Sequence, residues 1–121
     1  MFVASASFTF AEYGIYYGTS QKVANTTFRF ETMIIQPYNL SLYKEYTGKK
    51  VCYLSVGEFD GTSEELSNLN LSTAVIGYNS EWGSYIMNVS DPKWQTYLIQ
   101  EEQELRTLGC HGLFLDTLWQ D

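Results

Sequence analysis

The sequence contains few basic residues and no long apolar run. Lysine and arginine number 7 against 14 aspartates and glutamates, which gives a net charge of −7. A protein that binds nucleic acid or an anionic membrane surface needs a basic face to meet the phosphates, and these cations are spread along the chain. No apolar stretch approaches the roughly 20 residues that span a bilayer. We therefore expect neither a nucleic-acid partner nor a membrane partner.

Histidine and cysteine are also scarce. The chain has one histidine, His111, and two cysteines, Cys52 and Cys110. A protein-built metal site needs a cluster of His, Cys or carboxylate ligands at close spacing, and no such cluster occurs in the sequence. Two cysteines do not form the framework of a small disulfide-rich fold. These shortages predict that the protein has no metal site, and we interpret His111 as a structural residue.

Aromatic residues and N-glycosylation sequences, by contrast, are abundant. Aromatics make up 17% of the 121 residues and apolar residues 45%, which is enough for a packed core and for rings that line a binding surface. The pattern Asn-X-Ser/Thr begins at Asn25, Asn39, Asn70 and Asn88. This excess favours a secreted or extracellular protein.

Short apolar runs that stop at Gly, Pro or polar residues predict five strands. The runs are mostly continuous rather than alternating, as expected of parallel strands that are covered on both faces. The predicted strands are Tyr13–Gly18, Thr32–Gln36, Lys50–Val56, Tyr85–Val89 and Gly112–Leu118.

Helical segments are predicted between these strands. The clearest runs from Pro92 to Leu108, because Asp91 is a good N-cap and Gly109 is a good C-terminal stop. The other predictions are a helix over Leu40–Thr47 capped by Asn39, a weaker one between Ser20 and Phe28, and a long polar connection over Asp60–Ser84 with a helical turn near Glu64–Leu69.

Strand alternating with helix predicts an α/β fold with a parallel sheet. One architecture that fits is a complete five-stranded doubly wound domain, for which about 120 residues is a natural size. The other is a truncated TIM-type barrel, in which residues 1–121 form one partial (β/α) barrel domain with about five strands and no second domain. With the fourth strand between the third and the fifth, Cys52 and Cys110 are predicted to lie beyond the ~7 Å between Cα atoms that a disulfide allows.

Three motifs favour the barrel. Tyr53–Glu58 reads YLSVGE, Ser90–Gln95 reads SDPKWQ, and Gly112–Leu118 reads GLFLDTL. In this order and spacing they resemble the endo-α-1,4-polygalactosaminidase-like glycoside hydrolases of family 114. The resemblance implies a TIM-type barrel, cleavage of α-1,4-linked galactosamine-type polysaccharide, and no metal or organic cofactor.

Asp116 and Glu58 are the candidate catalytic carboxylates. Asp116 lies at the C-terminal end of the fifth predicted strand, where barrels carry their chemistry, and suits a nucleophile or a stabiliser of an oxocarbenium-like transition state. Glu58 ends the third strand, about 10 Å away across the fourth. We therefore interpret Glu58 either as a pocket carboxylate that orients substrate or tunes Asp116, or as a structural residue that hydrogen-bonds to a neighbouring loop. The resemblance implies that the proton donor comes from a later strand, outside these residues.

Candidate substrate-binding residues lie at or just beyond the predicted strand ends. Aromatic rings can stack on sugars, and Trp82 is the strongest candidate because it lies in a polar loop. Gln36 and Asn88 stand where members of the family often carry acids, and an amide keeps the hydrogen bonding but loses the charge that would hold an ammonium group. The full set is Tyr16, Tyr17, Gln36, Tyr38, Ser55, Trp82 and Asn88.

Two alternatives to an active hydrolase stay open: a non-catalytic carbohydrate-binding relative and an inactive fragment. Either would keep the aromatic rings and lack the acid. A five-strand arc of a barrel would also leave two strand edges unpaired, beside Ile15, Phe114 and Leu115. We therefore expect the isolated chain to be marginally stable and to self-associate through an edge.

Overall fold

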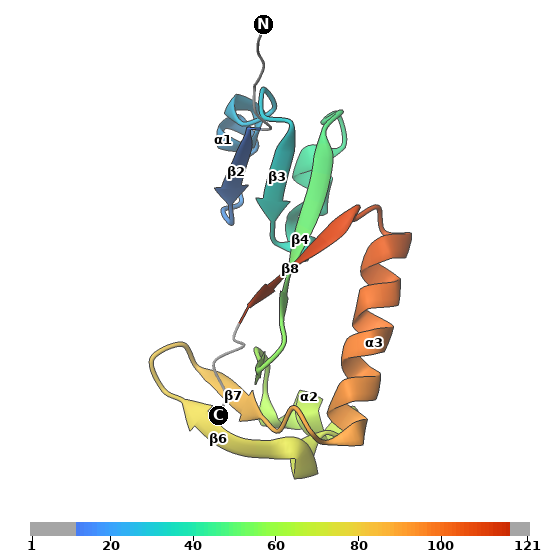
Figure 1. Ribbon diagram of the computed structural model, residues 1–121. Coiled ribbons are helices and arrows are strands. Elements are labelled where there is room, and N and C mark those ends of the chain that lie inside the picture. The colour runs from blue at the N-terminus through green and yellow to red at the C-terminus, as the bar shows by residue number, and fades with distance from the viewer. Residues whose placement is uncertain (1–11, 117–121) are drawn as a thin grey trace, which may run out of the picture. The chain divides into compact units, whose positions relative to one another are not determined.

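The computed structural model describes residues 12–116. The chain divides into two compact units, and the elements of each are coloured along the chain in Figure 1. The first unit contains residues 1–53 and 105–114, and the second contains residues 54–104 and 115–121.

The first unit is built on parallel strands, as predicted. Strands β2 (Tyr13–Tyr16), β3 (Thr32–Ile35) and β4 (Lys49–Ser55) lie side by side and parallel (Figure 1). Strand β8 (Gly112–Asp116) is the other neighbour of β4, so the sheet has four strands in the order β2-β3-β4-β8. Residues 117 and 118 of the last predicted strand lie outside the described part of the chain.

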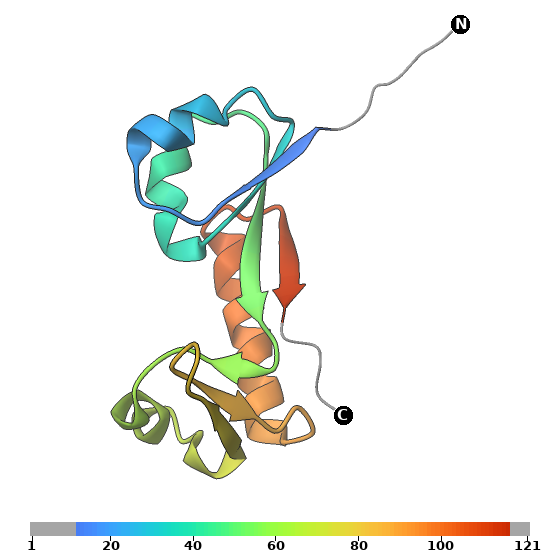
Figure 2. The same cartoon turned by 90° about the vertical axis from the view of Figure 1, so that its left-hand side faces the viewer.

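Two short helices pack against each other in this unit (Figure 2). Helix α1 (Gln21–Thr26) is capped by Ser20, whose side chain accepts a hydrogen bond from the Val23 N–H at 3.2 Å. The 3₁₀ helix η1 (Pro37–Tyr43) begins earlier than the predicted helix over residues 40–47. Proline suits the first position of a helix because its fixed φ is already helical. Asn39 is therefore inside η1 rather than at its cap, and its amide donates to the Gly18 carbonyl at 2.9 Å.

Cys52 and Cys110 form a disulfide, with Cα atoms 5.9 Å apart. The prediction that they lie too far apart was wrong because β4 and β8 are direct neighbours and no strand lies between them. His111 secures the start of this pairing. The backbone N–H of His111 donates to the Lys50 carbonyl at 2.8 Å, and its imidazole Nδ1 accepts from the Lys50 backbone N–H at 3.1 Å.

The second unit contains an antiparallel sheet that the sequence analysis did not predict. Its strands are β5 (Glu58–Phe59), β6 (Val75–Asn79) and β7 (Ser84–Met87), in the order β5-β7-β6. Strand β7 is the predicted fourth strand, but it pairs antiparallel with both neighbours and takes no part in the parallel sheet. The parallel sheet of the described residues therefore has four strands rather than five.

The long connection predicted as polar loop is mostly ordered. It holds α2 (Ser63–Asn68), the 3₁₀ turn η2 (Ser72–Ala74) and strand β6. A capping box starts α2, in which the Thr62 side chain accepts from the Glu65 N–H while the Glu65 carboxylate accepts from the Thr62 N–H. Six buried residues form the core of this unit: Phe59, Leu66, Leu71, Ala74, Met87 and Trp94.

Helix α3 (Pro92–Thr107) agrees with its sequence prediction. The Asp91 carboxylate accepts from the Lys93 N–H at 2.8 Å, and Gly109, at φ +111°, ends the helix. Trp94 faces the core and its indole N–H donates to the Val56 carbonyl at 2.8 Å. No helix within residues 12–116 is long and apolar enough to cross a membrane.

Candidate functional site

The C-terminal ends of β4 and β8 meet directly. The Val56 N–H, just after β4, donates to the Asp116 carbonyl at the end of β8, at 2.9 Å. Ser55 is the last residue of β4 and Asp116 the last of β8. The predicted separation of about 10 Å assumed an intervening strand, whereas neighbouring strands lie only about 4.8 Å apart. Ser55 and Asp116 are thus brought to adjacent strand ends, where parallel α/β folds carry their chemistry.

Glu58 occupies a different position from the one predicted. Strand β4 ends at Ser55, and the chain bends through residues 56 and 57 before Glu58 opens β5 in the antiparallel sheet. The side chain is 7% exposed. The Ser84 hydroxyl donates to Oε1, and the Asn79 amide donates to Oε2 at 3.4 Å. Glu58 is therefore a buried carboxylate with a donor on each oxygen.

Asn79 links Glu58 to the turn that carries Trp82. The amide oxygen of Asn79 accepts from the backbone N–H groups of Glu81 and Trp82, at 3.1 and 3.3 Å. The Asn79 carbonyl accepts from the Gly83 N–H at 2.7 Å, and Gly83 takes a φ of +69°, which an L side chain rarely adopts. Because the amide oxygen faces two donors, the amide nitrogen is left to face the Glu58 carboxylate. One side chain thus fixes both the turn and the carboxylate.

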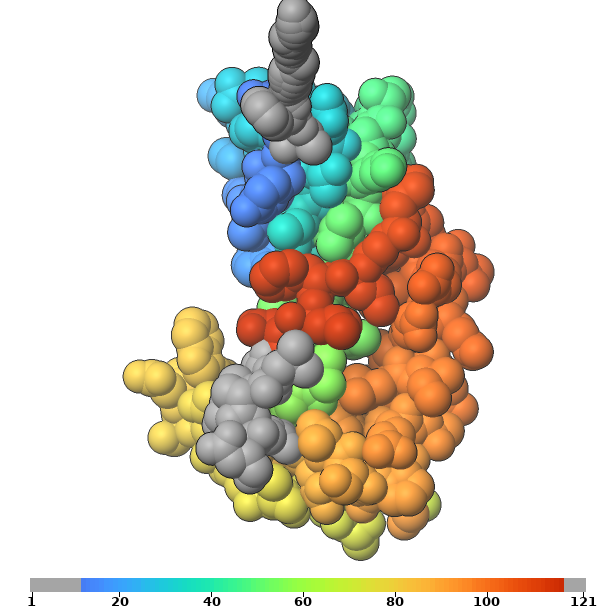
Figure 3. All heavy atoms as spheres, in the orientation of Figure 1, coloured from blue at the N-terminus to red at the C-terminus, as the bar shows by residue number. Residues whose placement is uncertain are grey.

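Trp82 itself projects from this ordered turn and is 77% exposed. Figure 3 shows the segment of β6 and its turn, in yellow, uncovered at the surface in that view. Tyr78 and Tyr85 pair across the hairpin, with ring centroids 5.1 Å apart in an edge-to-face arrangement. The predicted placement of Trp82 in a polar loop before the strand is confirmed, and the loop is a tight hairpin turn.

Asn79 and Ser84, the two hydrogen-bond partners of Glu58, were not among the predicted site residues. A signal for them existed in the alternation of Ile76 and Tyr78 with Tyr85 and Met87 around a segment with Asn and Gly. That pattern is typical of a β-hairpin.

Asn88 does not end a parallel strand. It follows β7, and its side-chain oxygen accepts from the Ser90 N–H at 3.0 Å in the turn that leads into α3. Its backbone N–H donates to the Ala74 carbonyl at 2.8 Å. Asn88 therefore organises a turn of the second unit, away from the strand end where it was expected.

The remaining candidates belong to the first unit. The Tyr16 hydroxyl accepts from the Ser20 N–H at 3.0 Å, and the Tyr17 ring meets the Tyr53 ring edge-on with centroids 5.5 Å apart. Gln36 immediately precedes η1 without capping it through its side chain, and Tyr38 lies within η1, largely exposed.

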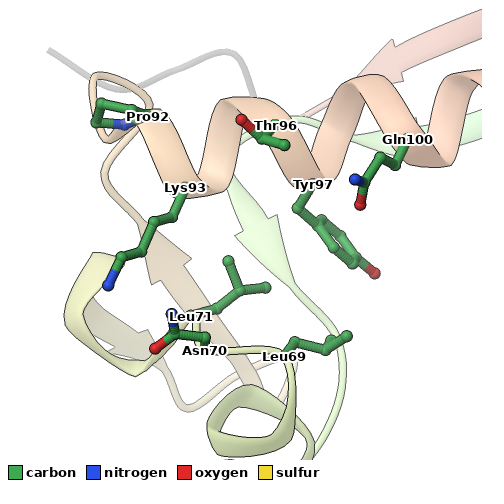
Figure 4. Close-up of a pocket in the computed structure, with 8 residues that line it drawn as sticks. All are labelled: Leu69, Asn70, Leu71, Pro92, Lys93, Thr96, Tyr97 and Gln100. Carbon is green, nitrogen blue, oxygen red and sulfur yellow. The ribbon is translucent and has the colours of Figure 1, made fainter.

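A pocket of about 350 Å³ lies in the second unit, and no predicted site residue lines it (Figure 4). Its walls come from the α2–η2 connection and from the first turns of α3. Burial, with smaller contributions from Glu101, Glu104 and Glu65, raises the pKa of its Tyr97 to about 12. Within residues 12–116, no group of three His, Cys, Asp or Glu side chains is arranged to hold a metal ion. The lining residues are Leu69, Asn70, Leu71, Pro92, Lys93, Thr96, Tyr97 and Gln100.

Residues 20–120 match the family model of glycoside-hydrolase family GH114. The chain belongs to this family. The resemblance inferred from the three sequence motifs is thereby confirmed. No curated protein matches the sequence.

Two solved structures are similar to this chain. The glycoside hydrolase domain of PelA from Pseudomonas aeruginosa is 29% identical, with a TM-score of 0.74, over 90% of this GH114 chain and 45% of the PelA chain. Ega3 from Aspergillus fumigatus, solved in complex with galactosamine, shares the fold at 16% identity, with a TM-score of 0.65, over 88% of this chain and 44% of Ega3. This chain thus spans about half the length of either relative. The predicted fold class, parallel (β/α) units of a TIM-type barrel, is confirmed.

Proposed function

We propose that this GH114 chain carries part of the active site of a hydrolase that cleaves α-1,4-linked galactosamine-type polysaccharide. The observation that carries the proposal is the family match over residues 20–120 together with Asp116, which lies at the end of β8 beside the end of β4. The two solved relatives support it, since one is a glycoside hydrolase domain and the other was solved with galactosamine.

Asp116 is proposed as the nucleophile or as the carboxylate that stabilises the oxocarbenium-like transition state. It is exposed at its strand end, as a group that must reach substrate has to be. Glu58 is proposed to orient substrate or tune Asp116 rather than to give up a proton, because both of its oxygens already accept hydrogen bonds. The proton donor is then proposed to lie outside these 121 residues.

Within each unit, aromatic rings and amides are the side chains proposed to bind sugar. Trp82, exposed on a turn that Asn79 holds in place, can stack on a pyranose ring. Within the second unit, the charges of Glu58 and Asp116 are proposed to recognise an ammonium group. Asn88, whose side-chain oxygen accepts from the Ser90 N–H, is proposed to offer its amide N–H groups to substrate without charge. Ser55 is a further proposed binding residue of the second unit. In the first unit, the proposed binding residues are Tyr16, Tyr17, Gln36 and Tyr38.

We also propose that the protein is secreted or extracellular. The Cys52–Cys110 disulfide supports this because disulfides persist in oxidising compartments and are rare in reducing ones. Protein purified from the culture medium of its native host should contain no titratable thiol at either position before reduction. Recovery of the protein only from the cytosol, with both thiols free, would overturn the proposal.

The function is tested with the full-length protein on α-1,4-linked galactosamine oligomers. Wild type should release shorter oligomers, and Asp116→Asn should lower kcat by about 10³-fold or more while the protein stays folded. The matched control is Asp60→Asn, which changes an exposed aspartate of the same unit and should leave the rate unchanged. Binding of the oligomers without cleavage by wild type would favour the carbohydrate-binding alternative.

The 121-residue chain alone provides a second test. Positioned general acids contribute about 10²–10⁴-fold, so the chain without its proton donor should be slower than the full-length protein by that factor. Equal turnover by the two would show that Glu58 is itself the proton donor.

A further inference from the structure

The pocket of the second unit faces away from Glu58. Neighbouring residues of a strand point to opposite faces of its sheet, and Glu58 and Phe59 are neighbours in β5. The Glu58 side chain meets Ser84 and Asn79, whereas the Phe59 ring packs against Tyr97, which lines the pocket, with centroids 6.0 Å apart. The pocket therefore lies on the other face of the sheet from Glu58, and neither Glu58 nor Asp116 lines it.

The pocket combines apolar and polar groups as small-molecule sites do. Leu69, Leu71 and Pro92 provide apolar surface, and the Tyr97 ring is fixed by stacking on Trp94 at 5.3 Å between centroids. In the close-up, Tyr97 extends from α3 on the side of Leu69, Gln100 extends toward the Tyr97 ring, and Lys93 extends on the side of Asn70 (Figure 4). Its volume of about 350 Å³ is at the lower end of the range of ligand pockets, about 300–1,000 Å³, and suits one sugar unit.

Several polar groups in this pocket have no side-chain hydrogen bond within the described part of the chain. They are the amides of Asn70 and Gln100 and the ammonium group of Lys93, which among them offer donors and acceptors to a ligand. The Tyr97 phenol, whose pKa is about 12, keeps its proton throughout the neutral range and adds a donor. This mixture matches the hydroxyl and amide groups of a sugar better than a purely apolar molecule.

The charges around the pocket favour a neutral ligand. Lys93 is the one charged residue in the lining and repels an ammonium group at its end. Glu65, Glu101 and Glu104 act on Tyr97 from outside the lining and disfavour an anion at the other end. A ligand of either charge would thus be repelled at one end, whereas a neutral ring would not.

We propose that this pocket is a second carbohydrate site, which binds one neutral pyranose unit, an N-acetylated rather than a free amino sugar. The choice of a sugar rests on the proposed function, while the preference for a neutral unit rests on the pocket itself. The site holds the polysaccharide on the face of the antiparallel sheet opposite Glu58.

The test measures binding to the full-length protein carrying Asp116→Asn, so that hydrolysis does not consume the ligand. The probes are N-acetylgalactosamine and galactosamine, titrated by calorimetry with saturation-transfer NMR to detect contact. N-acetylgalactosamine should bind several-fold more tightly than galactosamine. Tyr97→Phe, which keeps the ring packing, and Gln100→Ala should each weaken that binding about fivefold, as expected for one lost hydrogen bond.

Charge reversal provides the decisive comparison. Lys93→Glu should reverse the preference, so that galactosamine binds more tightly than N-acetylgalactosamine. The control is Lys44→Glu, the same change on an exposed lysine of the first unit, which should keep the preference of the full-length Asp116→Asn protein. Equal binding of the two sugars, or binding that Tyr97→Phe, Gln100→Ala and Lys93→Glu all leave unchanged, would overturn the proposal. Hydrolysis by wild type is measured in parallel. Pocket binding without hydrolysis would reject the proposed function alone, and hydrolysis without pocket binding would reject the second site alone.

Discussion

The two units of the chain are stabilised internally by different interactions. In the first unit, parallel strands pair in regular register and a disulfide joins β4 to the start of β8. In the second, a short antiparallel sheet packs on an aromatic core, and a buried carboxylate is held by Ser84 and Asn79. The first unit is a parallel sheet cross-linked by a disulfide, whereas the second is stabilised by side-chain packing and side-chain hydrogen bonds.

This difference suggests that the first unit contributes mainly to stability and the second mainly to chemistry. Apart from Asn39, the buried polar side chains of the described residues are Glu58 and Ser84, both in the second unit. Burying a charge costs free energy unless it is hydrogen-bonded, so a network like that of Glu58 is not expected where packing alone would serve. We infer that the second unit tolerates the free-energy cost of burying the Glu58 carboxylate because the carboxylate serves function, while the first unit contributes mainly to stability.

The largest expected effect is on the free energy of unfolding, through loss of the disulfide in the first unit. Replacing both cysteines, Cys52→Ala with Cys110→Ala, opens a loop of 58 residues and should lower the free energy of unfolding by about 4 kcal/mol, measured by denaturant titration. Wild type treated with reductant should unfold at the midpoint of the double variant. An unchanged midpoint in the double variant would contradict the view that the first unit relies on this bond.

A smaller effect is expected on activity when Glu58 loses its charge. Glu58→Gln preserves the shape of the side chain, so the full-length protein should fold, but kcat/KM should fall about 10²-fold because a preorganised charge at the site is gone. The control is Glu45→Gln, an exposed glutamate of the first unit, which should retain full activity. If both variants were equally active, the site would not depend on the second unit's network.

The first unit was the part that sequence could predict best. Apolar runs bounded by Gly and Pro located β2, β3, β4 and β8 to within about two residues, because each strand is encoded locally. The adjacency of β4 and β8 is a non-local property, and assigning Tyr85–Val89 to the same sheet hid it. That single error explains both the missed disulfide and the false expectation of a strand between β4 and β8.

The candidate site was predictable only in part for the same reason. The motifs YLSVGE and GLFLDTL identified Glu58 and Asp116, but the partners of Glu58 lie 21 and 26 residues along the chain. They come from the hairpin of β6 and β7. Strand β6 is short and partly exposed and was predicted as polar loop, whereas β7 was predicted as a strand of the parallel sheet. Local sequence patterns therefore identified the two carboxylates but not Asn79 and Ser84, which hydrogen-bond to Glu58.

Asn79→Asp tests that network directly. The substitution keeps the oxygen that accepts from the turn N–H groups and replaces the amide donor with a second oxygen facing Glu58. Loss of the donor and repulsion between two carboxylates should cost about 1–3 kcal/mol of unfolding free energy at pH 7. The loss should shrink near pH 4, where the pair can share a proton. A loss independent of pH would mean that only the turn, and not Glu58, depends on Asn79.

The smallest expected effect is on the free energy of unfolding at high pH, where ionisation of Tyr97 in the second unit can be distinguished from ionisation of tyrosines in the first. Burial and nearby carboxylates raise the pKa of Tyr97 from 10.0 to about 12. Between these values the folded protein keeps the phenol proton and the unfolded chain has lost it, so unfolding releases a proton and stability falls as pH rises. Because Tyr97 is only half buried, solvent screening reduces the loss to about 1 kcal/mol.

Tyr97→Phe should remove this component of the pH dependence, since phenylalanine packs on Trp94 and Phe59 but has no proton to lose. The measurement is the free energy of unfolding from pH 9 to pH 12, compared between wild type and variant. Burial also raises the pKa of Tyr43 and Tyr46 in the first unit, but both remain in each protein and cancel in the difference. Tyr13→Phe, which changes an exposed tyrosine of the first unit, should give the wild-type slope. Parallel curves for wild type and Tyr97→Phe would show that the high-pH loss arises in the first unit, and would remove the basis for treating the Tyr97 phenol as a fixed donor in the pocket.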